Sequence, residues 1–188
     1  MSTSSASQTL QQRVAAAILD GAARTLAIQG PAASMNDVAA AAGVARATVY
    51  RYFPNRQALL DELALAAFRE IEERIRSARI AEVPTDEAIA RVVRTLVDVG
   101  DLFTVLARER PRPAEFESTL AAPLAQLFER AQAGGDIRGD LAASWLTEVL
   151  VGVAVSVLTA KPSRGREDTV AAITSLFLRG ARSRGLRP

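Results

Sequence analysis

Hydrophobic residues recur at steps of three and four along most of the chain, and this spacing places them on one face of a helix. The first such run ends at Gly30-Pro31, because glycine suits the end of a helix and proline cannot continue one. No segment shows the strict alternation that is typical of a strand. The pattern therefore predicts an all-α protein with nine helices, over residues 11–29, 34–42, 46–53, 54–79, 85–100, 101–109, 114–133, 140–160 and 166–184.

The two short helices over residues 34–42 and 46–53 are joined by a tight turn at Gly43. Ser34 and Asp37 have the spacing of a capping box, so we expect the first of these helices to begin at Ser34. Two short helices linked by a tight turn form a helix-turn-helix, whose second helix enters the major groove of DNA. The apolar residues that would pack inward are Val38, Val44, Val49 and Phe53.

The second of these helices carries side chains suited to DNA. Arg46, Ala47 and Tyr50 share a face, since residues three and four apart on a helix are neighbours. Arg46 lies at the start of the helix, where a guanidinium can contact guanine with two hydrogen bonds, and Ala47 can touch a thymine methyl group. Thr48 and Tyr50 offer hydroxyl groups for phosphates. The positions that flank this face are Thr48, Arg51 and Tyr52.

The composition narrows the classes of function. The chain has no cysteine and no histidine, which excludes disulfides and removes the commonest zinc ligand and general base. Carboxylates, Lys161 and hydroxyl groups are left for catalysis, so a small all-α enzyme is only a remote alternative, and we expect no catalytic residue, no metal and no cofactor. Residues 1–60 carry five Arg and two Asp, which favours an anionic partner for this part of the chain.

The sequence shows neither a membrane span nor a secretory leader. Its longest apolar run, from Leu146 to Ala160, is interrupted by Glu148 and is shorter than a helix that crosses a bilayer. The first residues, MSTSSASQTLQQR, have no apolar core and no early basic cluster. We therefore expect a cytoplasmic protein with no membrane partner.

The stretch SMNDVAAAAGVARATVYRYFPNRQALL resembles the DNA-binding signature of the TetR family of transcriptional regulators, and RVAAAILDGAARTLAIQG resembles that family's first helix. The resemblance runs from Arg13 to Leu60 without a gap. It implies a bacterial regulator with an N-terminal three-helix helix-turn-helix domain and a C-terminal helical domain for ligand binding and dimerisation. The expected boundaries are a disordered tail over residues 1–9, the DNA-binding domain over 10–56 and the second domain over 57–188.

The resemblance also implies where DNA is contacted. The family places phosphate contacts at positions held here by Ser34, Thr48, Tyr50 and Arg56, and Tyr52 matches a position that contacts base or backbone. Ala45 stands where the family often has Ser or Thr, so the usual hydroxyl cap of the recognition helix is missing. Arg51 fits an exposed surface charge equally well. The full set of expected DNA-binding residues is Ser34, Arg46, Ala47, Thr48, Tyr50, Arg51, Tyr52 and Arg56.

After Ile80 the chain resembles the family only in the number, length and order of its helices. Aromatic side chains are expected to line a pocket for a small, mainly hydrophobic ligand, with core packing as the alternative. The run from Leu146 to Ala160 is apolar on nearly every side, so we expect a homodimer through the last two helices, with packing inside the chain as the alternative. The expected pocket residues are Phe68, Phe103, Phe116, Phe128 and Trp145. The expected interface residues are Gly152, Ser156, Ile173 and Phe177.

These observations predict a sequence-specific DNA-binding regulator, expected to act as a repressor. Its predicted partners are a double-stranded DNA operator, a second copy of the chain and a small-molecule effector of unknown identity. The effector would favour a conformer whose two recognition helices no longer match successive major grooves. A DNA-binding repressor or architectural protein that acts without a ligand is the alternative.

Overall fold

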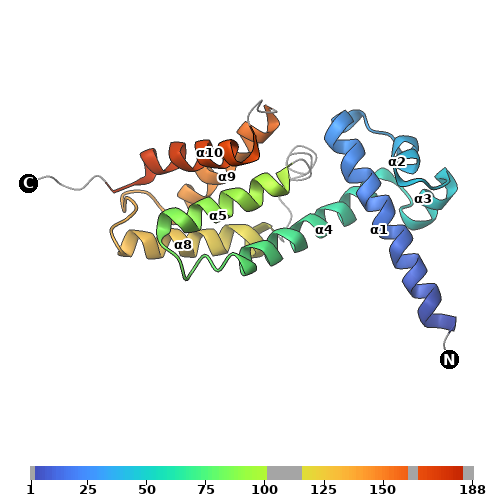
Figure 1. Cartoon of the computed structure of the whole chain (residues 1–188), viewed down its shortest axis with the longest axis horizontal. Coiled ribbons are helices and arrows are strands. Elements are labelled where there is room, and N and C mark those ends of the chain that lie inside the picture. The colour runs from blue at the N-terminus through green and yellow to red at the C-terminus, as the bar shows by residue number, and fades with distance from the viewer. Residues whose placement is uncertain (1–2, 101–115, 161–164, 184–188) are drawn as a thin grey trace, which may run out of the picture. The chain divides into compact units, whose positions relative to one another are not determined.

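The computed structural model describes residues 3–100, 116–160 and 165–183 (Figure 1). These residues form eight α-helices and no strand, and their one isolated bridge pairs Ile137 with Arg182. Each α-helix corresponds to one predicted segment, and the ninth prediction, 101–109, lies outside the described residues. The all-α class is therefore confirmed. None of the described helices is both long and apolar enough to cross a membrane.

The chain divides into two compact units, residues 1–66 and 67–188, and each is described by itself. The N-terminal unit begins with α1, which runs from Thr3 to Gln29, so residues 3–9 are helical where the sequence led us to expect a disordered tail. No glycine or proline precedes Gly21 in this segment, so nothing in it breaks a helix. The elements that follow are a 3-10 turn (Gly30–Ala32), α2 (Met35–Ala42), α3 (Arg46–Tyr52) and the first part of α4 (Arg56–Ser77).

The helices α1 and α2 cross at Gly21. A Cβ atom added to this glycine would lie 2.8 Å from the backbone nitrogen of Ala42 and 3.0 Å from its Cα atom. Two helix backbones can approach this closely only where one of them carries no side chain. Ile18, Ala22 and Leu26, on the same side of α1, are fully or almost fully buried. Gly21 therefore sets the distance at which α2 is held.

The helix α4 begins two residues later than the sequence suggested. Pro54 was expected to open it, but the first helical residue is Arg56 and the side chain of Asn55 forms the cap. The backbone N–H of Ala58 donates a hydrogen bond to the Oδ1 atom of Asn55 at 2.8 Å. An Asn cap satisfies one of the N–H groups that a helix start leaves without a partner. The boundary between the two units falls inside this helix, after Ala66, ten residues beyond the expected domain boundary.

The C-terminal unit is a helical bundle. Beyond the second part of α4 it contains α5 (Thr85–Asp98), a π-helical turn (Glu117–Ala121), α8 (Ala122–Ala133), α9 (Ala143–Thr159) and α10 (Arg166–Ala181). Its core brings together side chains from distant parts of the chain: the rings of Phe128 on α8 and Phe177 on α10 lie 5.4 Å apart at a tilt of 39°. Leu96 on α5 and Leu150 on α9 are fully buried with them.

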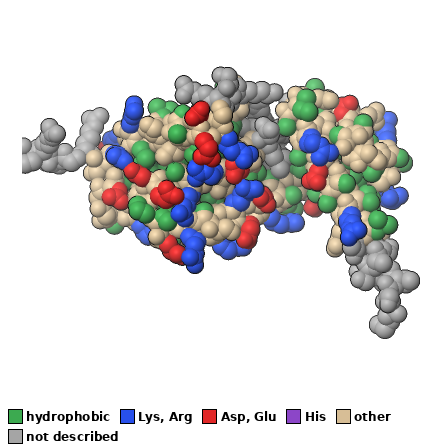
Figure 2. All heavy atoms as spheres, viewed as in Figure 1, with side chains coloured by type: hydrophobic (Ala, Val, Ile, Leu, Met, Phe, Trp, Pro, Cys, Tyr) green, Lys and Arg blue, Asp and Glu red, His purple; other side chains and the backbone are tan. Residues whose placement is uncertain are grey.

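Ion pairs tie the helices of the C-terminal unit together at its surface. The Asp98 carboxylate lies 3.0 Å from a guanidinium nitrogen of Arg74 on α4 and 3.1 Å from one of Arg166 on α10. Arg94 on α5 pairs with Glu167 on α10 at 2.8 Å. Acidic and basic side chains alternate over the face of this unit that Figure 2 shows. These pairs fix the first turn of α10 against α4 and α5.

Candidate nucleic-acid interface

The first helix of the helix-turn-helix begins at a complete capping box. The Oγ atom of Ser34 accepts a hydrogen bond from the backbone N–H of Asp37 at 3.2 Å, and the backbone N–H of Ser34 donates to the Asp37 carboxylate at 2.9 Å. The Ser34 hydroxyl also donates to this carboxylate, at 2.6 Å. The hydrogen bond from the Ser34 side chain, and to a smaller extent the one from its backbone, hold the pKa of Asp37 below its ordinary value. The predicted capping box is therefore confirmed.

The turn depends on the left-handed conformation of Gly43. Its φ is +67°, a region that side-chain-bearing residues rarely adopt. The N–H of Gly43 donates to the carbonyl of Ala40 at 3.2 Å, and the N–H of Val44 donates to that of Ala39 at 3.1 Å. This pair of bonds closes the end of α2 and reverses the chain. The direction in which α3 leaves the turn is thus set by one glycine.

Two apolar residues hold α3 against the rest of the unit. Val49 is completely buried and Phe53, directly after the helix, is 5% exposed. Ala45 precedes the helix without a side-chain cap, as the sequence indicated. Because one face of α3 is anchored in this way, its opposite face is exposed to water. The exposed residues of α3 are Arg46, Ala47, Tyr50 and Arg51, and its half-buried ones are Thr48 and Tyr52.

All eight predicted DNA-binding residues lie in the N-terminal unit. Ser34 is exposed at the start of α2, six of the residues are on α3, and Arg56 is half-buried as the first residue of α4. These positions combine cationic groups with hydroxyl groups on the surface around α3. Cationic and hydroxyl groups of this kind are the usual partners of phosphates and base edges in DNA.

The structure shows two contacts on α3 that the spacing of residues in the sequence did not specify. The guanidinium carbon of Arg46 lies 5.3 Å from the centre of the Tyr50 ring, and that of Arg51 lies 5.3 Å from the centre of the Tyr52 ring. A cation within about 6 Å of a ring centre is attracted to its face. The separation of Arg46 and Tyr50 by four residues is the signal that could have predicted the first pair.

Two residues that support the site were not found from the sequence. Gly21 allows the close crossing of α1 and α2. Arg24 on α1 donates a hydrogen bond from its guanidinium to the backbone carbonyl of Ala41 at 2.8 Å, near the end of α2, where carbonyl groups lack helical partners. Neither residue belongs to a local motif, because each acts on a segment that lies about twenty residues further along the chain.

The residues predicted to line a pocket differ in their burial. Phe68 and Phe116 are each 5% exposed and Phe128 is fully buried, so these three fill the core. Trp145 is 53% exposed and faces outward from α9. Phe103 lies outside the described residues. The pocket itself stays a prediction.

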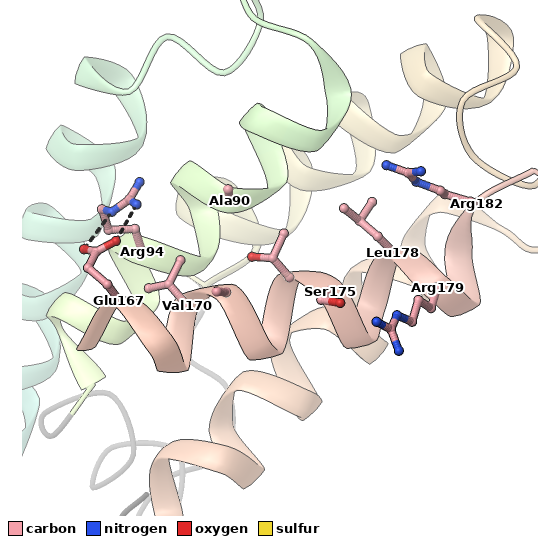
Figure 3. Close-up of a pocket in the computed structure, with 10 residues that line it drawn as sticks. Ala90, Arg94, Glu167, Val170, Ser175, Leu178, Arg179 and Arg182 are labelled. Carbon is pink, nitrogen blue, oxygen red and sulfur yellow. Dashed lines mark hydrogen bonds and ion pairs between the residues drawn. The ribbon is translucent and has the colours of Figure 1, made fainter. Parts of the chain in front are cut away.

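An open groove of about 470 Å³ lies between α5 and α10 (Figure 3). Arg94 and Glu167 face each other at one end, and their hydrogen bond raises the pKa of the arginine and lowers that of the carboxyl group. Arg182 pairs with Asp86. The groove is lined by Ala90, Arg94, Glu167, Val170, Ala171, Thr174, Ser175, Leu178, Arg179 and Arg182, and includes none of the predicted pocket residues.

The four residues predicted for a dimer interface divide into two pairs. Gly152 and Ser156 are exposed on α9. Ile173 and Phe177 are 1% and 5% exposed within the single chain, and Phe177 packs on Phe128. The last two side chains are therefore covered within the chain itself, and the interface stays a prediction.

The capped α2, the glycine turn and the anchored α3 define a helix-turn-helix protein. The family model of the bacterial regulatory proteins of the tetR family matches residues 18–63. The transcriptional repressor LfrR of Mycolicibacterium smegmatis is 41% identical over 92 residues, which cover 49% of this chain and 48% of LfrR. A regulator of Mycobacterium tuberculosis is 30% identical over 154 residues, covering 80% of this chain and 63% of that protein. The chain thus spans between about half and two thirds of the length of these curated relatives.

Solved structures extend the likeness to the second unit. The crystal structure of LfrR in complex with proflavine matches with a TM-score of 0.77 at 30% identity, over 91% of this chain and 97% of that one. A second LfrR structure matches with a TM-score of 0.66 over 87% of this chain. The chain belongs to the TetR family of transcriptional regulators.

Proposed function

We propose that this protein is a sequence-specific repressor that binds its DNA operator as a homodimer and is released by a small, mainly hydrophobic ligand. The observation that carries the DNA-binding part is the anchoring of α3. Because Val49 and Phe53 are buried, the opposite face of a short helix is held rigidly toward water with Arg46 and Tyr50 on it. A rigid helix with polar side chains at its start is what major-groove recognition requires.

The roles within this surface follow from side-chain chemistry. Arg46, at the first position of α3, is proposed to contact a guanine with two hydrogen bonds. Ala47 is proposed to contact a thymine methyl group. Ser34, Thr48, Tyr50 and Arg56 are proposed to contact phosphates, and Arg51 and Tyr52 to contact the backbone or base edges beside them.

Selection from a random double-stranded DNA library tests sequence recognition. Wild-type protein is expected to enrich one motif with two related halves. Arg46→Ala should lose about 1–3 kcal/mol of discrimination at one base pair of each half while keeping the rest of the motif. Arg130→Ala is a matched control, because it removes an exposed arginine from α8 in the other unit. Absence of any enriched motif with wild-type protein would overturn the proposal.

The homodimer is supported by large exposed apolar side chains on each of the last two helices. Trp145 is 53% exposed on α9, and Gly152 and Ser156, which are also exposed, lie on the same side of that helix. On α10 the exposed large apolar residue is Leu176, at 62%. Large exposed apolar side chains beside small ones are typical of a helix face that a partner covers. We propose that this face, in place of Ile173 and Phe177, forms the interface.

Trp145 is the single tryptophan of the chain, so its fluorescence reports on this face alone. Dilution of wild-type protein should shift the emission to longer wavelength and increase quenching by acrylamide as dimers dissociate. Leu176→Glu should give monomers in sedimentation at concentrations where wild type is dimeric, since a buried unpaired charge opposes association. Leu10→Glu is the matched control, because Leu10 is 63% exposed on α1. A monomer mass for wild type at all concentrations would contradict the dimer.

Ligand release is supported by the likeness to LfrR, whose structure was solved with proflavine. Proflavine is therefore the first probe, and it should raise the unfolding temperature of the protein measured in the absence of DNA. Saturation should then weaken operator binding, because a ligand shifts a conformational equilibrium only through unequal affinity for the two conformers. If neither proflavine nor a panel of apolar amphiphiles changes either quantity, a repressor that acts without a ligand is favoured.

A further inference from the structure

The two exposed arginines of α3 each lie over an aromatic ring. The guanidinium carbons of Arg46 and Arg51 each lie 5.3 Å from the ring centre of a tyrosine on the same helix. In the part of the chain that the structure describes, neither guanidinium has a carboxylate partner. Several exposed arginines of the C-terminal unit differ, because they are ion-paired: Arg74, Arg76, Arg94, Arg138 and Arg182.

This difference matters for binding. A guanidinium held by a carboxylate has committed some of its five N–H donors, and that pair must break before the donors reach another acceptor. A guanidinium attracted to a ring face is held without a hydrogen-bond acceptor, so its N–H groups stay available for another molecule. Stacking on a tyrosine therefore fixes the direction of an arginine without using the groups that recognise a base.

The geometry of the first pair favours a role in recognition. Arg46 is the first residue of α3, and Tyr50 lies one helical turn further on and is 37% exposed. Residues four apart lie on one face of the helix, so ring and guanidinium point to the same side. Arginine has a long side chain that loses much conformational entropy when it is fixed, and ordering it before binding removes part of that cost.

We infer that the ring of Tyr50 is a platform that positions the guanidinium of Arg46 for base recognition, a role separate from any contact of the Tyr50 hydroxyl with phosphate. This inference rests on the proposed function as a sequence-specific DNA-binding protein. Tyr50 then carries two separable roles: its hydroxyl contributes to affinity for all sequences, and its ring contributes to the choice of one base pair.

A pair of substitutions separates the two roles. Tyr50→Phe removes the hydroxyl and keeps the ring, whereas Tyr50→Leu removes both. The base pair read by Arg46 is identified first, as the one at which Arg46→Ala loses discrimination. Affinities are then measured for the selected operator and for its variants at that base pair. Circular dichroism and thermal unfolding establish that each variant is folded.

Tyr50→Phe should weaken binding to every operator variant by the same factor and leave discrimination within about twofold of wild type. Tyr50→Leu should reduce discrimination at the Arg46 base pair by a further factor of about 2–5, the size expected for loss of an exposed cation–π contact. In an Arg46→Ala background, Tyr50→Phe and Tyr50→Leu should give the same discrimination at this base pair, since the guanidinium that the ring positions is gone.

A second readout needs no DNA. The side-chain protons of a stacked Arg46 should show upfield ring-current shifts in the proton NMR spectrum of the free protein. These shifts should persist in Tyr50→Phe and disappear in Tyr50→Leu. Equal discrimination by Tyr50→Phe and Tyr50→Leu would overturn the positioning role while the proposed function stands. Absence of any preferred sequence for wild-type protein would overturn both.

Discussion

Arginines serve different purposes in the two units. Some arginines of the C-terminal unit join helices: Arg74 and Arg166 share the Asp98 carboxylate, and Arg94 joins α5 to α10 through Glu167. On α3 the arginines lie over tyrosine rings instead. An arginine that stabilises a fold has its donors committed, whereas one that recognises another molecule keeps them available.

The apolar residues show the same contrast. In the N-terminal unit a glycine turn and a cap fix the short helices, and buried side chains such as Val49 hold them against the rest of the unit. The C-terminal unit relies on aromatic packing between helices far apart in sequence, as between Phe128 and Phe177. Four predictions test this contrast. The unfolding of each unit can be followed separately, because Trp145 lies in the C-terminal unit and both tyrosines, Tyr50 and Tyr52, lie in the N-terminal unit.

The largest effect is expected from Phe128→Ala. This side chain is fully buried, so its truncation should lower the free energy of unfolding by about 3–5 kcal/mol, from lost burial and the cavity left behind. Urea unfolding followed by Trp145 fluorescence at fixed protein concentration measures it. Phe128→Leu should lower the free energy of unfolding clearly less than Phe128→Ala. A loss below about 1 kcal/mol for the alanine variant would mean that long-range aromatic packing does not hold this unit together.

Gly21→Ala is the corresponding test of the N-terminal unit. The added methyl group would lie 2.8 Å from the backbone nitrogen of Ala42, and a backbone cannot rotate away as a side chain can. We expect a loss of about 1–3 kcal/mol, typical of overpacking. The near-ultraviolet circular dichroism of Tyr50 and Tyr52 should report it during unfolding. An alanine variant as stable as wild type would show that α1 and α2 are not held by this close crossing.

Ser34→Ala should have a smaller effect, about 0.5–2 kcal/mol, because it removes the side chain that caps α2. Ser34→Asp, which can still accept the hydrogen bond from the Asp37 N–H, should recover part of the loss. Thermal unfolding followed by tyrosine circular dichroism measures both variants. If alanine and aspartate behave alike, the cap does not contribute to the stability of this unit.

The smallest effect concerns pH. Hydrogen bonding to Arg94 lowers the pKa of Glu167 in the folded chain. A carboxyl group with a lowered folded pKa stabilises the fold above its ordinary pKa of about 4.5 and loses that contribution as the pH falls through the folded value. Wild type should therefore unfold at a slightly higher temperature than Glu167→Gln at pH 7, and the two should converge at pH 3. A difference that persists at pH 3 would rule out this ion pair as its source.

The sequence predicts the N-terminal unit well because its determinants are local. The capping box of Ser34 and Asp37 and the turn at Gly43 depend on residues a few positions apart, and the structure confirms both. The helix spacing also placed Val49 on the buried face. The crossing at Gly21 could not be predicted, because a glycine inside a helix gives no sign of what the opposite segment brings near it.

The C-terminal unit was harder to predict because its determinants are long-range. An aromatic residue on a helix can fill the core or face water, and the local pattern did not distinguish buried Phe128 from exposed Trp145. The run from Leu146 to Ala160 is apolar all round, so periodicity could not identify its outward face. Ile173 and Phe177 recur at helical spacing, but that spacing does not say whether a partner or the same chain covers them.

DNA recognition by the N-terminal unit is tested most directly by measuring operator affinity as a function of salt for wild type, Arg56→Ala and Arg130→Ala. Wild type should bind the selected operator at least about a thousandfold more tightly than scrambled DNA, with log affinity falling linearly with log salt. Arg56→Ala should bind all sequences more weakly with a salt slope reduced by about one, and Arg130→Ala should match wild type. Equal effects of the two substitutions, or equal wild-type affinity for operator and scrambled DNA, would contradict DNA recognition by the N-terminal unit.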